Sequence, residues 1–199
     1  MSVPRRIGLF GGTFDPPHDA HLALARAALD QLGLDRLLWI PAGQPWQKTG
    51  VRALTDAAHR AAMVELAIAG EPRFVLERSE LERPGPSYTL DTVRELRSRE
   101  PGNEWFLIIG QDQYARLATW HGWRELLPLV TLAVAARAGA APQADPALAA
   151  LPHRMVPIVL APMPHASTAL RAGVAPLASM VPLAVARYID RHHLYSGHA

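Results

Sequence analysis

Short apolar runs that end at glycine, each followed by a stretch with helical spacing, limit what this chain can fold into more than any other feature. The first run covers residues 7–10 and ends at Gly11 and Gly12, and apolar residues then recur at helical spacing across residues 21–32. A second run, at residues 36–41, has the fully apolar centre of a strand that is covered on both faces of a parallel sheet. The pattern therefore predicts a strand, a glycine turn, a helix and a second, parallel strand.

The same alternation continues toward the C-terminus. Further strands are expected at 73–77, 105–109, 131–136 and 155–160, helices at 56–69, 89–99 and 182–193, and short helical segments across 113–127. Residues 137–152 are rich in Ala, Pro and Gly, and we expect an irregular connection or a short, poorly fixed helix there. Alternating strands and helices predict an α/β fold, a Rossmann-like doubly wound parallel sheet with helices on both faces. The length suits a single domain, 1–199, with a C-terminal helical portion from about residue 165.

Composition excludes several classes of protein. The chain is 49% hydrophobic and 19% charged, which fits a folded globule rather than a disordered or bilayer-spanning chain. The absence of cysteine excludes disulfides, thiolate nucleophiles and Cys-based zinc sites. No apolar run is long enough for a membrane span and no secretory signal is recognisable, so we expect a cytoplasmic protein without a membrane partner. The 20 basic residues are spread out and nearly balanced by 18 acidic ones, which argues against nucleic-acid binding. A homo-oligomer stays open.

The loop between the first strand and the first helix carries residues that suit a phosphate ligand. In an open α/β sheet this loop lies at the carboxyl end of its strand, where ligands bind. Its glycines let a ligand approach the backbone, and the helix start is expected to offer unpaired N–H groups and the positive end of its dipole. His18 and His21 are three residues apart and share one face of the first helical turn. Either histidine alone would more simply be a cap or a surface residue, and zinc would need a third ligand.

The loop also resembles a known signature. Gly11-Gly12-Thr13-Phe14-Asp15-Pro16-Pro17-His18-Asp19-Ala20-His21 is similar to the G-x-F-D-P-x-H-x-G-H element of the nucleotidyltransferase superfamily. Ala20 stands where the superfamily usually has Gly, which is the smallest change possible and is compatible with a helix.

Four more segments resemble one family of that superfamily, the bacterial nicotinate mononucleotide adenylyltransferases. They are Trp39 to Lys48 after the second strand, Ser87-Tyr88-Thr89-Leu90-Asp91-Thr92, Gly110-Gln111-Asp112 with the downstream Trp120 and Trp123, and His165-Ala166-Ser167-Thr168-Ala169-Leu170-Arg171. Departures from the family pattern fall at Gln47, His165 and Ala166. Taken singly, Ser87 and Thr89 suit helix caps, the two tryptophans suit a core, and Lys48 and Arg171 suit solvent-exposed charges. Because the segments follow strand ends and helix starts, a parallel sheet would gather them at one edge.

The resemblance implies a role for each matching residue. Catalytic roles fall on His18, His21 and Arg171, and ATP binding falls on Gly11, Gly12, Thr13, Phe14, His18, His21, Ser167, Thr168 and Arg171. Binding of the mononucleotide falls on Lys48, Tyr88, Thr89, Asp112 and Trp120. Mg²⁺ is expected to be carried mainly by ATP, with no metal site in the protein. A neighbouring polyphosphate is expected to raise the pKa values of the two imidazoles and to favour their doubly protonated form.

The function implied is transfer of the adenylyl group of ATP to nicotinate mononucleotide, giving nicotinate adenine dinucleotide and pyrophosphate. The nearest alternative is a phosphopantetheine adenylyltransferase, in which the first signature histidine is typically Thr, whereas this chain has His18. A non-catalytic nucleotide sensor on the same fold could lose His or Arg, and this chain retains His18, His21 and Arg171. A fragment of a tRNA synthetase would need a basic surface that the balanced charge does not supply. Use of the amide mononucleotide stays open.

Overall fold

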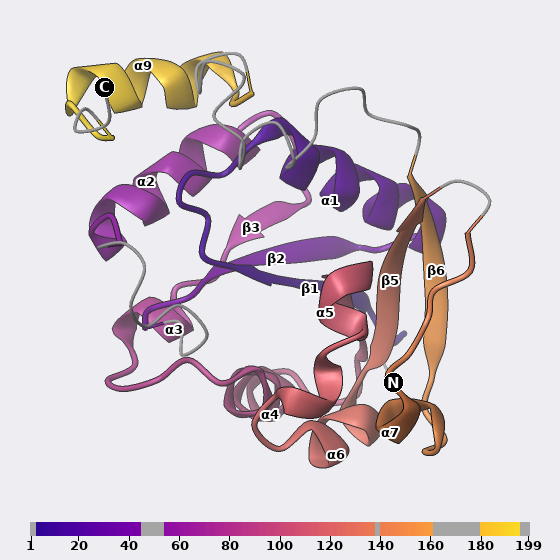
Figure 1. Ribbon diagram of the computed structural model, residues 1–199. Coiled ribbons are helices and arrows are strands. Elements are labelled where there is room, and N and C mark those ends of the chain that lie inside the picture. Colours follow the sequence, from indigo (N-terminus) through magenta and orange to yellow (C-terminus); the bar gives the residue numbers. More distant parts are fainter. Residues whose placement is uncertain (1–2, 45–53, 138–139, 161–179, 196–199) are drawn as a thin grey trace.

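A single sheet of six parallel strands forms the centre of the molecule (Figure 1). The computed structural model describes residues 3–44, 54–137, 140–160 and 180–195. The strands are β1 (Arg6–Gly12), β2 (Arg36–Pro41), β3 (Phe74–Leu76), β4 (Glu104–Gly110), β5 (Thr131–Arg137) and β6 (Met155–Leu160). Their order is β3-β2-β1-β4-β5-β6, so the chain runs outward from β1 in one direction and then from β4 in the other. This order confirms the expected doubly wound sheet.

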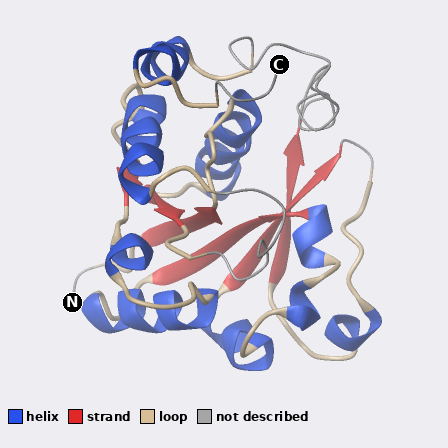
Figure 2. Cartoon of the chain, turned by 60° about the vertical axis from the view of Figure 1, so that its left-hand side comes forward, coloured by secondary structure: helices blue, strands red, loops and turns tan. Residues whose placement is uncertain are grey.

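Helices cover both faces of the sheet (Figure 2). They are α1 (Asp19–Leu32), α2 (Ala57–Ile68), α3 (Ser79–Glu82), α4 (Thr89–Arg99), α5 (Gln111–Tyr114), α6 (Trp123–Leu126), α7 (Pro146–Ala149) and α9 (Leu183–Arg191), with 3₁₀ turns η2 (Leu117–Thr119) and η3 (Leu127–Leu129). The segment 113–127, expected to be helical in short pieces, is divided among α5, η2 and α6. Helix α3, one turn long, was not expected, because four residues carry no periodic signal.

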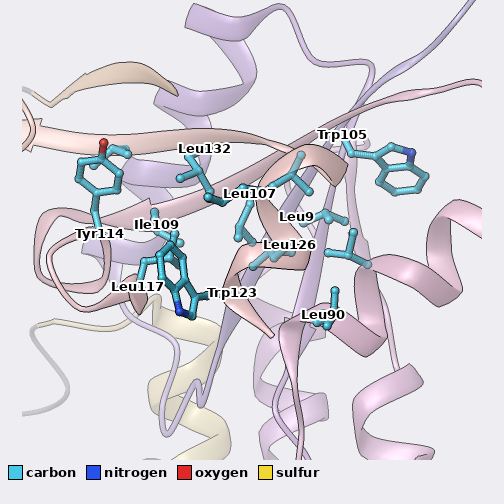
Figure 3. Close-up of a cluster of buried hydrophobic side chains, with 14 of the residues drawn as sticks. Leu9, Leu90, Trp105, Leu107, Ile109, Tyr114, Leu117, Trp123, Leu126 and Leu132 are labelled. Atoms are coloured by element: carbon cyan, nitrogen blue, oxygen red, sulfur yellow. The ribbon is translucent and has the colours of Figure 1, made fainter. Parts of the chain in front are cut away.

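Two apolar cores lie on opposite faces of the sheet. One lies beneath α4, α5 and α6, and Figure 3 shows Trp123 in it beside Ile109 and Leu117. The other lies beneath α1 and α2. Successive residues of a strand point to opposite faces, and Leu9 and Phe10 of β1 accordingly belong to different cores. Strands buried on both faces are therefore apolar along their whole centre, as the sequence indicated.

Helix α9 packs on α2 rather than on the sheet (Figure 1). A third, smaller core joins Met63 of α2 to Val185 and Ile189 of α9. The Nδ1 atom of His59 and the hydroxyl of Tyr188 add a hydrogen bond of 2.9 Å across the same contact. Residues 161–179, which include the start of the expected C-terminal helical portion, lie outside the described residues. Within the described ranges, no helix is both long enough and apolar enough to cross a bilayer.

Candidate active site

The two central strands part at their carboxyl ends. Pairing between β1 and β4 ends at Leu9 and Leu107, although each strand continues for three further residues. Over those residues β1 stays paired with β2, and β4 stays paired with β5. Among the described residues, a methyl group added to Gly11 would meet no heavy atom within 4 Å apart from its chain neighbours, so they leave space beside the end of β1. In doubly wound sheets this is the place where ligands bind.

The two signature histidines lie side by side at the start of α1. Their rings stack with centroids 3.5 Å apart and planes 17° from parallel, which confirms that they share one face of the first turn. Each ring also caps the other residue's backbone: Nδ1 of His18 accepts from the His21 amide at 3.3 Å, and Nδ1 of His21 accepts from the His18 amide at 3.2 Å. This is a capping box built from two imidazoles.

The capping box fixes the protonation of the pair. Because both Nδ1 atoms accept hydrogen bonds, they carry no proton, and each neutral ring has its N–H at Nε2. Burial lowers the pKa of His18 to about 4. The doubly protonated form expected beside a bound polyphosphate stays a prediction, and in the protein without ligand a proton on Nδ1 would break the cap. The pair can still present Nε2–H donors to an anion.

The start of α1 is less open than the sequence indicated. The Asp19 amide donates to the carbonyl of Met180 at 2.9 Å, and the His21 amide donates within the capping box. Two of the N–H groups expected to be unpaired are therefore engaged, one of them by the C-terminal part of the chain. The helix dipole and the imidazoles remain as the attraction for an anion at this end.

Phe14 and Asp15 stabilise the loop after β1 through ring packing and hydrogen bonds. The Phe14 side chain is 2% exposed and has a positive φ of 49°, and its ring meets the His21 ring edge-on at 5.1 Å. Phe14 was expected among the ATP-binding residues, and its buried ring acts on the site by supporting His21. Asp15 accepts from the Thr55 amide at 3.3 Å and from the hydroxyl of Tyr195, so it fixes the turn as expected.

A second group of expected residues gathers around the start of α4. The Ser87 hydroxyl does not cap α4 but accepts from the amides of Gly43 and Gln44, at 3.0 and 3.3 Å, in the segment after β2. Tyr88 is the N-cap residue, and its side chain makes no capping hydrogen bond to this helix within the described part of the chain. Its ring stacks on His121, with centroids 4.3 Å apart and planes 26° from parallel. His121 was not singled out in the sequence, because a lone histidine beside Trp120 carries no signal of its own.

Trp120 and Trp123 differ in how deeply they are buried. Trp123 is 7% exposed and lies in the core beneath α6 (Figure 3), while Trp120 is only partly buried and packs at the edge of that core. Trp120 directly precedes His121, so it lies near Tyr88 and the start of α4. Asp112, exposed on α5, lies two residues after the end of β4. The remaining candidates, Lys48, Ser167, Thr168 and Arg171, lie outside the described residues.

Hydrogen bonds link the loop after β1 to the segment after β2, and that segment to the start of α4. A buried arginine, Arg60 of α2, donates to the carbonyls of Thr13 after β1 and of Ala42 and Gly43 after β2. Ser87 then joins the segment after β2 to the start of α4. Arg60 could not be singled out from the sequence, because an arginine in a helix is usually a solvated charge.

A parallel sheet of this order, with a histidine pair where β1 and β4 part, defines an α/β nucleotide-binding protein. Comparison with known proteins agrees with this class. The sequence model of the cytidylyltransferase-like family matches residues 9–173. The chain belongs to that family and, within it, to the nicotinate-nucleotide adenylyltransferases.

Relatives support both levels of this assignment, and solved structures share the fold. A protein of Methylibium petroleiphilum named "probable nicotinate-nucleotide adenylyltransferase" is 55% identical, over 98% of this chain and 94% of that protein. One of the same name from Albidiferax ferrireducens is 46% identical, over 96% and 98% of the two chains. Structures of Plasmodium falciparum nicotinic acid mononucleotide adenylyltransferase, complexed with APC or with NaAD, share the fold with TM-scores of 0.73 and 0.74. Each is 18% identical and covers 98% of both chains.

Proposed function

We propose that this protein transfers the adenylyl group of ATP to nicotinate mononucleotide and releases pyrophosphate. The stacked pair of His18 and His21, at the point where β1 and β4 part, is the observation that carries the proposal. It supplies two hydrogen-bond donors and a helix dipole where a triphosphate would lie. Membership of the nicotinate-nucleotide adenylyltransferases indicates nicotinate mononucleotide as the second substrate.

The reaction needs positioning and neutralisation of charge more than covalent chemistry. A phosphate oxygen of the mononucleotide attacks the α-phosphorus of ATP and forms a new P–O bond. The bond from that phosphorus to the oxygen bridging the α- and β-phosphates breaks on the opposite side, and pyrophosphate leaves with the electron pair. Such transfers are catalysed by holding the reacting atoms in line and by stabilising the charge that develops on the phosphoryl oxygens.

Within this proposal the triphosphate lies against the loop after β1. The open space at Gly11 admits phosphate oxygens close to the backbone. His18 and His21 are assigned to the phosphates as donors through Nε2, while their Nδ1 atoms stay in the capping box. Donors that are fixed in advance stabilise a transition state without a cost of reorganisation.

The mononucleotide lies toward the start of α4. In the part of the chain that the structure describes, Tyr88 makes no side-chain cap at the start of this helix, and the helix dipole favours the nicotinate carboxylate beside Tyr88 and Thr89. The partly buried Trp120 can receive the pyridine ring by stacking. Asp112, exposed after β4, suits a ribose hydroxyl, to which a carboxylate accepts a hydrogen bond.

The residues outside the described ranges complete the proposal. Arg171 with Ser167 and Thr168 is assigned to the β- and γ-phosphates, and Lys48 is assigned to the phosphate of the mononucleotide. ATP is taken as its magnesium complex, which reduces the charge that the protein must neutralise.

The test is release of pyrophosphate by the purified chain in the presence of ATP and Mg²⁺. Parallel reactions contain nicotinate mononucleotide, the amide mononucleotide or phosphopantetheine. We expect release with nicotinate mononucleotide, together with formation of nicotinate adenine dinucleotide. Release with phosphopantetheine alone would contradict the proposal. The ratio of the rates with the two pyridine mononucleotides measures the preference for the carboxylate.

A further inference from the structure

Arg60 is a buried cation whose hydrogen bonds all go to backbone carbonyls. It is 1% exposed, although it lies near the start of α2. Its guanidinium donates to Thr55 at 2.9 Å, to Thr13 at 3.0 Å, to Ala42 at 2.6 Å and to Gly43 at 3.3 Å. Burial lowers the pKa of Arg60, and the nearby Asp15 and Asp56 partly offset this effect. A buried arginine is rare unless specific partners require it.

The Arg60 guanidinium lies just beyond the point where β1 and β2 stop pairing. Pairing between β1 and β2 ends at Gly12 and Pro41, and one more backbone bond joins the Ala42 amide to the Gly12 carbonyl at 2.9 Å. Beyond that point the two segments leave the sheet. There Nη1 of Arg60 bridges the carbonyls of Thr13 and Ala42, so a side chain continues the cross-link that the strands no longer make.

The two segments joined in this way lead to different parts of the site. Thr13 opens the loop that carries His18 and His21. Gly43 is bound to Ser87, which directly precedes Tyr88 and Thr89 at the start of α4. A small displacement of Arg60 would therefore change the distance between the loop assigned to ATP and the segment assigned to the mononucleotide.

We propose that Arg60 is a positioning residue for adenylyl transfer, setting the separation and alignment of the two substrates through the carbonyls of Thr13, Ala42 and Gly43. The proposal rests on the proposed function. It differs from a purely stabilising role because in-line transfer depends on alignment to within about 1 Å, and misplacement of that size costs roughly 10²-fold in rate. Only an arginine offers donors in a rigid fork that reaches several carbonyls at once.

The experiment compares Arg60→Lys and Arg60→Met with the wild type at a temperature well below unfolding. Lysine keeps the charge but cannot span the same carbonyls, and methionine keeps the stem without the charge. We expect kcat to fall about 10²-fold in Arg60→Lys and further in Arg60→Met, with much smaller changes in KM for either substrate. The matched control is Ile68→Ala, at the other end of α2, where a buried side chain is lost far from both segments. It should lower stability but leave kcat near the wild-type value.

A second readout does not depend on turnover. Native-state hydrogen exchange at the amides of Gly43 and Gln44 should accelerate in Arg60→Lys more than in Ile68→Ala at equal global stability. Wild-type kcat in both Arg60 variants would overturn the positioning role, and so would failure of both variants to fold, which would make Arg60 a requirement of the fold itself. If the wild type releases no pyrophosphate with either mononucleotide, the proposed function fails. The exchange measurement then decides whether Arg60 holds the two segments.

Discussion

The two ends of the candidate site are built differently. At the loop after β1, several contacts hold the turn in place. The two histidines cap one another, the Phe14 ring packs against His21, and Asp15 accepts hydrogen bonds from Thr55 and Tyr195. At the start of α4, the ring of Tyr88 stacks on the exposed His121. No side-chain cap of this helix is seen among the described residues.

This difference matches what each end is proposed to bind. A triphosphate presents the same oxygens in every ATP, so rigid donors placed in advance serve it best. The pyridine mononucleotides differ by one substituent, and stacking on an aromatic ring tolerates a small change of the partner. The comparison therefore separates residues whose loss should act on turnover from residues whose loss should act on the affinity for one substrate.

The largest expected effect is that of His21→Ala. Loss of one preorganised donor to the transferring phosphates should lower kcat on the order of 10²- to 10³-fold, with the fold intact. Steady-state kinetics with both substrates measures the effect, and circular dichroism checks the fold. His192→Ala, an exposed histidine after α9, is the control and should retain wild-type kcat. Near-normal turnover in His21→Ala would remove the functional distinction between the two ends.

The next largest effect concerns stability and pH. His18 is neutral in the folded protein because burial lowers its pKa to about 4, whereas an unfolded histidine titrates near 6.5. Between these values the unfolded chain binds more protons, so the free energy of unfolding falls as pH falls from about 6.5 to 4 and is constant above that window. The free energy of unfolding lost across this window is about 3 kcal/mol.

Urea unfolding at a series of pH values measures this contribution. The reference is His18→Asn, which keeps a capping side chain but does not titrate. Burial also raises the pKa of Glu80, which makes the protein less stable above the ordinary titration range of that carboxyl, but this term is common to both proteins. The difference between them should shrink toward pH 4. A difference that does not change with pH would show that His18 is not held neutral.

At the other end of the site, Trp120→Ala should act on one substrate. Loss of a stacking surface should raise KM for nicotinate mononucleotide about tenfold and leave KM for ATP within twofold. Trp123→Phe is the matched control, because Trp123 lies in the core and its change should lower stability without altering the ratio of the two KM values. Equal increases of both KM values in Trp120→Ala would instead indicate a packing role for Trp120.

Much of the fold could be predicted because the sheet is buried on both faces. The bounds of β2, α4 and β6 agree with the expected ones, since each element carries a complete apolar pattern of its own period. Helix α3 could not be predicted in this way. Its backbone lies so close to the segment after β2 that a methyl group at Gly43 would approach the Glu80 carbonyl oxygen to 2.1 Å, and such a contact exists only once both segments are folded.

The sequence motif of the site could be predicted, but the contacts that hold its residues in place could not. His18 and His21 follow from spacing, because residues three apart meet on a helix. Their neutral state does not, since it depends on which nitrogen atoms accept the backbone amides. Arg60 and Tyr195 escaped detection for a related reason: their partners come from loops far away in the sequence, and no local pattern records such contacts.

The smallest expected effect tests the open space beside the end of β1. A methyl group at Gly11 meets no described residue within 4 Å apart from its chain neighbours, so Gly11→Ala should change the free energy of unfolding by less than about 0.5 kcal/mol. It should nevertheless raise KM for ATP about threefold, because the methyl group occupies space that phosphate oxygens would use. Gly43→Ala supplies the contrast, since its methyl group meets the Glu80 carbonyl and should cost about 1 to 3 kcal/mol of stability. Thermal unfolding and ATP titrations of both variants separate the two outcomes, and an unchanged KM for ATP in Gly11→Ala would mean that the triphosphate does not approach this backbone.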